Sequence, residues 1–515
     1  MYPIGRFGGP EIVNPTAQEL RALAAGGERT TRFGSASYVT KVRNRSAKNT
    51  YVVADGIQLG IMQQPFALRD FTAITEKVDA YLKDRTVIRL DRCMALHPKA
   101  RIGCRLYVTR EFARIAYMWQ VTLFPPRPGQ EPELTTVYVP EWPERMILVH
   151  PTKGITYILG TDYFGECKKS FLRMAMYLVK QKGWLGFHAG SKLLRVRGAD
   201  GELREVGFVM FGLSGIGKTT LTVQDHGLKP PEGVAIRQDD VVFMEPSGYC
   251  YGTEAGYFFK TEGLEPTQRV LYAAATHPEA ILENVWVTED GEVDFTNYEL
   301  TSNGRGVVSR SVVPLADDEI DLPRAHKLVF IIRRNDTVPP VARLSPEQAA
   351  AFFMLGESIE TSAGDPTRAG QSKREVGTNP FLIGPEAEEG NRFLEILRRN
   401  PDIECFLLNT GSVGAAPGTR GEKISVPVSA QIIKEIARGG MEWEFDPHWE
   451  YQVPRFVAGV PIKRYRPWTC YLPGEYSQLV ERLRRERLEW LGRFPGLDPA
   501  IPKAIECPLV NVAAG

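Results

Sequence analysis

Residues 206–220 of the chain read Val-Gly-Phe-Val-Met-Phe-Gly-Leu-Ser-Gly-Ile-Gly-Lys-Thr-Thr. The apolar run 206–212 is too short to cross a membrane and is typical of a strand that is buried on both faces. Gly212 to Thr219 then satisfy the pattern G-x-x-x-x-G-K-[ST], and a helix-compatible run, Thr219 to Gln224, follows. A strand, a glycine loop and a helix in this order predict a phosphate-binding loop. The alternative is a glycine-rich turn with an incidental Lys-Thr pair.

The residues of this loop have the chemistry that a triphosphate requires. Its glycines allow backbone N–H groups to point into one concavity around phosphate oxygens, Lys218 can reach the β and γ phosphates, and Thr219 can bind Mg²⁺. Downstream, a short apolar strand beginning at Val234 ends in Asp239 and Asp240, where an acidic metal contact is expected. Paired aspartates are also common in loops and caps, so that alternative stays open for the pair alone.

Length and composition limit the class of protein. A chain of 515 residues has room for two to four domains, at roughly 150 residues each. Its 63 Lys and Arg residues balance 62 Asp and Glu residues, which argues against nucleic acid as a partner. Hydrophobic residues make up 43% of the chain, as in ordinary soluble globular proteins.

The cysteines and the amino-terminal segment predict a soluble cytoplasmic protein without a membrane partner. Seven scattered cysteines with no C-x-x-C pair are typical of reduced thiols. The chain does not begin with a basic segment followed by an apolar one, and no apolar run approaches the roughly 20 residues that a bilayer requires.

Other regions have secondary-structure signals of their own. Gly165 to Lys182 is predicted to be a helix because its apolar residues recur at spacings of three and four, and Gly183 stands where a C′ glycine belongs. Residues 32–110 are expected to form an α+β region, with strands at 37–42, 49–53 and 86–90 and a helix at 69–83. Loops are expected at 125–133, 364–377 and 411–421.

Two lysines occupy an unfavourable position in the helix 165–182. Lys168 and Lys169 are expected in the first turn of the helix that Asp162 or its neighbours begin, where the macrodipole disfavours a cation by roughly 0.3–1 kcal/mol. A bound anion or metal would explain them, since a lysine near other positive charge has a lowered pKa and can act as a neutral ligand. The alternatives are two solvated surface lysines and, for His188 after the apolar run 184–187, a core histidine.

The order of these segments resembles the ATP-dependent phosphoenolpyruvate carboxykinase family, from about Arg43 to Trp468. The loop 212–220 is similar to the family's G-L-S-G-T-G-K-T-T, and 160–169, Gly-Thr-Asp-Tyr-Phe-Gly-Glu-Cys-Lys-Lys, resembles its G-T-x-Y-x-G-E-M-K-K. Arg43-Asn-Arg-Ser-Ala-Lys-Asn resembles T-G-R-S-P-K-D, and Thr301-Ser-Asn-Gly-Arg305 resembles T-E-N-T-R.

The resemblance implies an α/β protein of two lobes with mixed sheets and an active site in the cleft between them. The amino-terminal substrate-binding lobe is expected at 1–187, and the carboxy-terminal lobe, with the phosphate loop and the metal, at 188–515, including a lid near 364–381. The implied reaction is the reversible conversion of oxaloacetate and ATP to phosphoenolpyruvate, CO₂ and ADP. Mn²⁺ and Mg²⁺ are the implied metals, and a monomer or small homo-oligomer is expected.

The resemblance also implies roles for individual residues. Arg45 would hold the substrate carboxylate, Tyr163 would line the oxaloacetate or CO₂ pocket, and Arg305 would face the transferring phosphoryl group, as would Lys168 and Lys218. The implied Mn²⁺ ligands are Lys169, His188 and Asp240, and Thr219 would hold Mg²⁺. The implied nucleotide-binding residues are Gly212, Leu213, Ser214, Gly215, Ile216, Gly217, Lys218, Thr219, Thr220, Lys423, Ile424 and Ser429.

The sequence also departs from the family's pattern. Ile216 replaces a threonine inside the loop, Val241-Val242 stand where Glu-His is usual, and Lys423 and Ser429 replace arginine and threonine. Ala189-Gly-Ser follows the expected metal histidine in place of Cys-Ser-Ala, and the expected lid matches poorly. Two alternatives therefore remain: a diverged kinase on the same scaffold that phosphorylates another small molecule or a protein, and a nucleotide-sensing regulatory protein without turnover.

Overall fold

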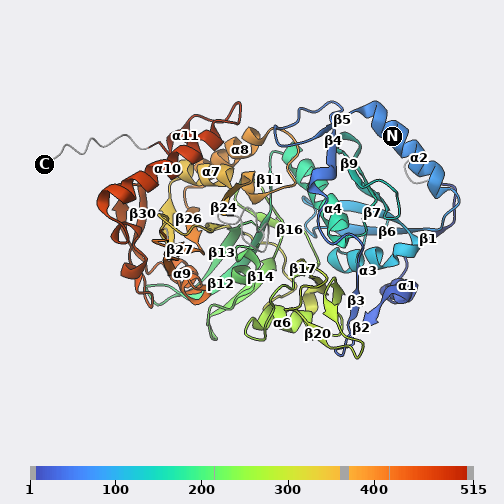
Figure 1. Ribbon diagram of the computed structural model, residues 1–515, viewed down its shortest axis with the longest axis horizontal. Coiled ribbons are helices and arrows are strands. Elements are labelled where there is room, and N and C mark those ends of the chain that lie inside the picture. Colours follow the sequence, from blue (N-terminus) through green and yellow to red (C-terminus); the bar gives the residue numbers. More distant parts are fainter. Residues whose placement is uncertain (1–6, 214, 360–370, 417, 507–515) are drawn as a thin grey trace. The chain divides into compact units, whose positions relative to one another are not determined.

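The computed structural model describes residues 7–213, 215–359, 371–416 and 418–506, and these form two compact units (Figure 1). Unit 1 comprises Met1–Lys182, Tyr251–Ile320 and Phe381–Gly384, and unit 2 comprises Gly183–Cys250, Asp321–Pro380 and Pro385–Gly515. This division differs from the expected one at 187/188, because two later segments of the chain pack with unit 1.

The larger sheet of unit 1 is mixed and has the order β1-β6-β7-β8-β10-β9-β4-β5. Its strands are β1 (Glu11–Val13), β4 (Thr50–Val53), β5 (Pro65–Phe66), β6 (Val87–Met94), β7 (Ile102–Thr109), β8 (Leu134–Val139), β9 (Met146–His150) and β10 (Ile155–Leu159). Strands β7, β8 and β10 run parallel, whereas β6 and β9 are antiparallel to their neighbours β7 and β10. The helices of unit 1 are α1 (Ala17–Ala24), α2 (Leu68–Leu82), α3 (Ala113–Thr122), α4 (Phe164–Gln181) and α6 (Arg269–Ala275).

A second sheet explains why residues 251–320 belong to unit 1. It has the order β17-β21-β18-β3-β2, with β2 (Arg29–Thr30), β3 (Ala36–Tyr38), β17 (Gly256–Lys260), β18 (Ile281–Glu283) and β21 (Arg305–Ser309). Strand β18 pairs in parallel with β3, so that Ile281 lies opposite Ala36. The later segment therefore completes a sheet that the first forty residues begin. A hairpin of β19 (Trp286–Val287) and β20 (Val293–Asp294) lies between these strands in the sequence.

Unit 2 is built on a mixed sheet of the order β14-β12-β13-β22-β26-β23-β30-β29. Its strands are β12 (Ala189–Arg197), β13 (Leu203–Phe211), β14 (Gly233–Gln238), β22 (Lys327–Ile332), β23 (Val341–Leu344), β26 (Glu404–Asn409), β29 (Glu442–Asp446) and β30 (Tyr451–Phe456). Short pairs are formed by β11 (Leu185–Phe187) with β15 (Val242–Met244), β24 (Glu357–Ile359) with β25 (Ser372–Arg374), and β27 (Ser412–Val413) with β28 (Glu422–Lys423). The helices are α5 (Lys218–Val223), α7 (Pro346–Leu355), α8 (Glu386–Arg399), α9 (Val426–Arg438), α10 (Pro473–Leu491) and α11 (Ala500–Lys503).

Strand β13, which leads into the glycine loop, is buried on both faces, as its apolar sequence predicted. Phe208 and Met210 pack into a core that includes Ile432 and Ile436 of α9. Phe211 stacks on Phe330 at 5.0 Å on the other face. Burial of residues 206–211 fixes the position from which the loop leaves the sheet.

Most of the predicted elements are confirmed within a few residues. The helix expected at 165–182 is α4 and the one expected at 69–83 is α2, whereas the strand expected at 37–42 ends at Tyr38. No disulfide joins the described cysteines, and no helix in the described part of the chain is long and apolar enough to cross a membrane.

Candidate active site

Helix α4 buries its charged residues as well as its apolar ones. It begins at Phe164, so Lys168 and Lys169 lie in its second turn. The sequence had predicted them in the first turn. They are only 2% and 8% exposed, which shows that the reading as solvated surface lysines is wrong. The ammonium of Lys168 forms a buried ion pair with Glu254 at 2.8 Å. A buried lysine needs such a partner or a ligand, because desolvation of its charge is costly.

Two carboxylates next to or within α4 fix the backbone around Arg45. Asp162 accepts hydrogen bonds from the backbone N–H groups of Lys41 and Val42 at 3.0 and 2.9 Å, and Glu166 accepts one from Ser46. Arg45 lies between these two anchors in the sequence. The segments 41–46 and 160–169, which are far apart in the sequence, therefore form one local structure.

Arg45 and Lys169 meet at the ring of Phe381. The guanidinium carbon of Arg45 lies 4.5 Å from the ring centroid, and the ammonium nitrogen of Lys169 lies 5.1 Å from it. The Nε atom of Arg45 is buried and has no hydrogen-bond partner among the described residues. Two cations on one ring, one of them incompletely paired, form a local positive field that suits an anionic substrate.

A second aromatic ring, Phe258, has Lys168 and Arg305 beside it. The Lys168 nitrogen and the Arg305 guanidinium carbon lie 5.7 and 5.3 Å from its centroid. Tyr163, which precedes α4, is 1% exposed, and burial raises the pKa of its phenol, so the phenol stays a proton donor. Gly165 allows this packing, because a Cβ atom there would lie 2.4 Å from the Tyr163 ring.

In unit 2 the glycine loop has the backbone that a phosphate cradle requires. Gly215 and Gly217 have φ angles of +86° and +101°, a region that favours glycine, and a Cβ at either position would meet no atom within 4 Å. Ile216 is 2% exposed and packs into the core, so its replacement of threonine leaves the backbone cradle unchanged. Its carbonyl accepts a hydrogen bond from Thr410 at 2.9 Å. Ser214 lies outside the described residues.

The expected metal and phosphate residues of unit 2 converge on Asp240. Its Oδ1 lies 3.1 Å from Nε2 of His188 and 3.8 Å from Nζ of Lys218, and all three side chains are largely buried. Asp240 follows β14, as expected, although β14 pairs antiparallel with β12. Thr219 is half-buried in the first turn of α5. The structure thus brings together residues that are as many as 52 positions apart in the sequence.

The tautomer of His188 favours a cation between its Nε2 atom and Asp240. Its Nδ1 lies 2.7 Å from the carbonyl of Thr378, and since a carbonyl only accepts, Nδ1 must donate. In the neutral imidazole, Nε2 then presents a lone pair to the Asp240 carboxylate, and two acceptors at this distance need a proton or a cation between them. Thr378 has φ of +53°, a strained conformation for a residue with a side chain.

The donor set fits a divalent metal only if a lysine takes part. Among the residues with described positions, no group of three or more His, Cys, Asp and Glu side chains could hold an ion. Of the three expected Mn²⁺ ligands, His188 and Asp240 belong to unit 2 and Lys169 to unit 1. An imidazole, a carboxylate and a neutral amine are a mixed nitrogen and oxygen set that suits Mn²⁺ better than Mg²⁺.

The residues expected at the adenine and ribose also lie in unit 2. Ile424 packs in the same core cluster as Leu213 and Ile216 of the loop, and its N–H donates to the carbonyl of Gly411 at 2.9 Å. Ser429 is 1% exposed, and its hydroxyl has no hydrogen-bond partner among the described residues. Lys423 is exposed on β28.

Some residues of the site were not predicted from the sequence. Glu254 and Phe258 contact expected site residues but lie far from them in the sequence and in no motif. Phe381 is the last residue of the expected lid, but its contacts with Arg45 and Lys169 were not predicted. Arg173 was also missed, although its position four residues after Lys169 places it on the same face of α4. Residues 364–370 of the expected lid lie outside the described residues, and Ser372–Arg374 forms β25.

Comparison with known proteins identifies relatives that match along most of their length. A sequence model described as phosphoenolpyruvate carboxykinase matches residues 11–463. A protein of Aeropyrum pernix named phosphoenolpyruvate carboxykinase (ATP) is 36% identical over 428 residues, which cover 82% of this chain and 84% of that protein. Proteins of the same name from Thermus thermophilus and Sinorhizobium fredii are 28% and 26% identical and cover 87% and 85% of this chain, and 87% and 83% of their own lengths. The chain therefore belongs to the phosphoenolpyruvate carboxykinase family.

Proposed function

We propose that this chain converts oxaloacetate and ATP reversibly to phosphoenolpyruvate, CO₂ and ADP. The observation that carries the proposal is the convergence of His188 and Lys218 on Asp240 beside a glycine loop, in a chain that matches the family over residues 11–463. The comparisons do not favour the alternative of a kinase with another acceptor.

Unit 2 would bind the nucleotide. The backbone N–H groups of the glycine loop and the ammonium of Lys218 would hold the phosphates, and Thr219 would hold the Mg²⁺ that accompanies ATP. The unpaired hydroxyl of Ser429 and the buried backbone at Ile424 would contact the adenosine. Helix α5 has only six residues, so the loop and Lys218 would supply most of the positive potential.

Unit 1 would bind the oxaloacetate. The guanidinium of Arg45 would hold a carboxylate of the substrate in a bidentate pair, and the phenol of Tyr163 would donate a hydrogen bond in the same pocket. Arg305 and Lys168 would neutralise charge on the phosphoryl group during its transfer. Positioning and charge neutralisation are sufficient for this step, and no protein nucleophile is required.

Lys169, His188 and Asp240 would hold Mn²⁺, which when bound supplies a positive charge for the enolate oxygen that decarboxylation leaves. The hydrogen bond from His188 to Thr378 would keep the imidazole in the tautomer that has its lone pair at Nε2. We place this chemistry in the cytoplasm, where the described cysteines would remain reduced.

An assay in the carboxylation direction tests the proposal. Purified protein with phosphoenolpyruvate, ADP, bicarbonate, Mn²⁺ and Mg²⁺ is expected to form oxaloacetate, measured by its reduction to malate with a coupled dehydrogenase. Lys218→Ala is expected to abolish this activity. Absence of oxaloacetate with ADP, GDP and inorganic phosphate as phosphoryl acceptors would reject the proposal.

A further inference from the structure

Arg173 is a buried cation without a counter-charge in contact. It is 4% exposed and makes no hydrogen bond and no ion pair with any residue that the structure describes. It makes a cation–π contact with the ring of Phe381, whose centroid lies 5.6 Å from the guanidinium carbon. Its guanidinium has five N–H donors, and none of them bonds to a described residue, so they are available to an anionic ligand.

Two further basic side chains lie close to Arg173. Arg45 and Lys169 lie at the same ring, at 4.5 and 5.1 Å from its centroid. Burial and, to a smaller extent, the charge of Arg45 lower the pKa of Arg173 to about 10, although the charge of Glu166 opposes this shift. The guanidinium remains protonated at neutral pH. The carboxylate of Glu166 already accepts the backbone N–H of Ser46.

We propose that Arg173 and Arg45 form one anion subsite at Phe381 and that this subsite binds the two carboxylates of a small dicarboxylate. The two guanidinium groups carry two positive charges, which a dianion would neutralise. The planar fork of each guanidinium matches a carboxylate, so two arginines can hold two carboxylates of one ligand. This assignment rests partly on the proposed function, in which oxaloacetate is the dicarboxylate and Arg45 alone was expected to hold it.

The subsite gives Arg173 a role in substrate affinity. Arg173 would make selection between a dicarboxylate and a monocarboxylate possible, because a monocarboxylate leaves one of the two guanidinium groups without an acceptor. The residue would thus act as a substrate-binding residue and not as a support for α4.

Binding of malonate tests the proposal without any turnover. Isothermal titration of the full-length protein in EDTA is expected to show malonate binding that is at least 10-fold tighter than acetate binding. Arg173→Met is expected to weaken malonate binding by 10-fold or more and Arg173→Lys by less, whereas acetate binding changes little. Arg92→Met is the matched control, because Arg92 is another arginine of unit 1 whose pKa burial lowers to about 10, and it bonds to the carbonyl of Gln120.

Thermal unfolding without ligand distinguishes a role of Arg173 in ligand binding from a structural role in α4. Since the variant removes a buried charge without a partner, Arg173→Met is expected to keep or raise Tm, and malonate is expected to raise Tm of the wild type only. A fall in Tm with unchanged malonate binding would overturn the proposal, as would wild-type protein that binds inorganic phosphate more tightly than malonate. If Arg173→Met does not fold, Arg173→Lys and Arg173→Gln decide by the same titration.

The proposed function can fail separately from this inference. If the wild type binds malonate through Arg173 but forms no phosphoenolpyruvate from oxaloacetate, the subsite stands and the assigned reaction is wrong. If the enzyme is active, KM for oxaloacetate is expected to rise at least 10-fold in Arg173→Met, with a smaller change in kcat. An active enzyme whose Arg173→Met variant keeps both KM and malonate affinity would overturn the subsite alone.

Discussion

Each unit contains a group of buried arginines, and the two groups differ in what faces them. In unit 2, Arg487 pairs with Glu357 at 2.8 Å with both side chains 0% exposed, and Arg374 approaches the same carboxylate at 3.4 Å. In unit 1, neither Arg173 nor Arg45 forms an ion pair with a residue that the structure describes. The first arrangement stabilises a fold, and the second leaves cations available to a ligand.

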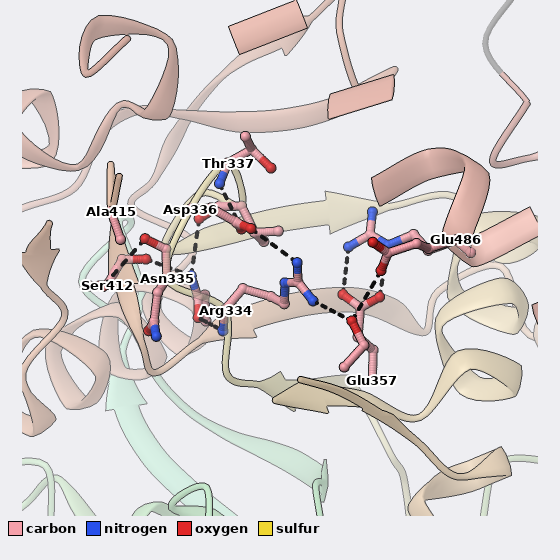
Figure 2. A network of polar contacts seen from close by, with 12 residues as sticks. Arg334, Asn335, Asp336, Thr337, Glu357, Ser412, Ala415 and Glu486 are labelled. Carbon is pink, nitrogen blue, oxygen red and sulfur yellow. Dashed lines mark hydrogen bonds and ion pairs between the residues drawn. The ribbon is translucent and has the colours of Figure 1, made fainter. Parts of the chain in front are cut away.

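The paired group extends through a network in unit 2 (Figure 2). Arg334 bonds to Asp336 at 3.0 Å and to Ser372 at 3.1 Å, and its carbonyl accepts the N–H of Ser412. The network therefore ties the β24–β25 hairpin to the segment that follows β26. Because every arginine in it has a carboxylate partner, we expect it to contribute to stability and not to bind an anion.

Removal of the shared carboxylate is expected to have the largest effect. Glu357→Gln leaves Arg487 buried without its counter-charge, and loss of one partner of such a pair costs about 3–5 kcal/mol. Urea unfolding of the variant measures this loss in unit 2. A decrease below about 1 kcal/mol would show that the network is not a stabilising element.

The pH dependence of stability is expected to differ in sign between the units. Although burial alone would raise it, Arg487, Arg334 and Arg374 lower the pKa of Glu357 to about 2, so its contribution is present above pH 4.5 and is lost as pH falls toward 2. In unit 1, burial raises the pKa of Glu283 to about 7, although Glu283 forms an ion pair with Arg114. Arg114 also pairs with Asp162. The Glu283 carboxyl therefore favours folding below pH 4.5 and loses this contribution as pH rises through 7.

Each of these shifts corresponds to about 3 kcal/mol at 1.36 kcal/mol per pKa unit. Urea unfolding measures the free energy of unfolding as a function of pH. The wild type is expected to lose free energy of unfolding as pH falls below 4.5, and Glu357→Gln is expected to abolish this loss. Glu283→Gln is expected to abolish the loss that the wild type shows between pH 4.5 and 7. Identical pH profiles for the wild type and either variant would contradict the assignment for that residue.

Loss of the unpaired cation at Arg45 is expected to affect activity and not stability. Arg45→Ala is expected to lower kcat/KM for oxaloacetate by about 100-fold, since a bidentate charge-assisted contact to a carboxylate is worth about 2–3 kcal/mol. Steady-state kinetics measures this change, and Lys48→Ala, an exposed cation of the same segment, is the control. Equal losses in both variants would mean that local charge, and not a specific contact, determines the effect.

An exposed pair is expected to have the smallest effect. Arg455 and Glu442 lie 2.8 Å apart on β30 and β29, but they are 64% and 55% exposed. Glu442→Gln is expected to change the free energy of unfolding by less than about 0.5 kcal/mol, measured as for Glu357→Gln. A larger change would show that exposure does not explain the contrast between the pairs.

Patterns within a short stretch of sequence predicted much of the fold and of the nucleotide site. The apolar run before the glycine loop and the periodicity of α4 depend on neighbouring residues, so they could be identified without a structure. The positive φ angles of Gly215 and Gly217 follow from the same local pattern. Pairing between distant segments could not be found in this way, and the parallel register of β18 with β3 places 251–320 in unit 1 without any local signal.

The site residues show the same limit. The place of the two lysines in a helix marks them as unusual, although they lie in its second turn and not in the predicted first turn. Their partners Glu254 and Phe381 come from elsewhere in the sequence, and no pattern at those positions indicates the contact. Arg173 is different, because its spacing from Lys169 in the sequence already places both residues on one face of the helix. Only its burial without a partner could not be predicted from the sequence.

The central proposal is that Arg45 and Lys218 serve one reaction, in which oxaloacetate loses CO₂ and ATP transfers its γ-phosphoryl group. Transfer of label from γ-³²P-labelled ATP tests it most directly, with ¹⁴CO₂ release from oxaloacetate labelled at its leaving carboxylate followed in the same reaction. We expect equal amounts of labelled phosphoenolpyruvate and ¹⁴CO₂, a parallel decrease of both by about 100-fold in Arg45→Ala, and loss of both in Lys218→Ala. Phosphoryl transfer that persists in Arg45→Ala, or label on another acceptor, would contradict the account.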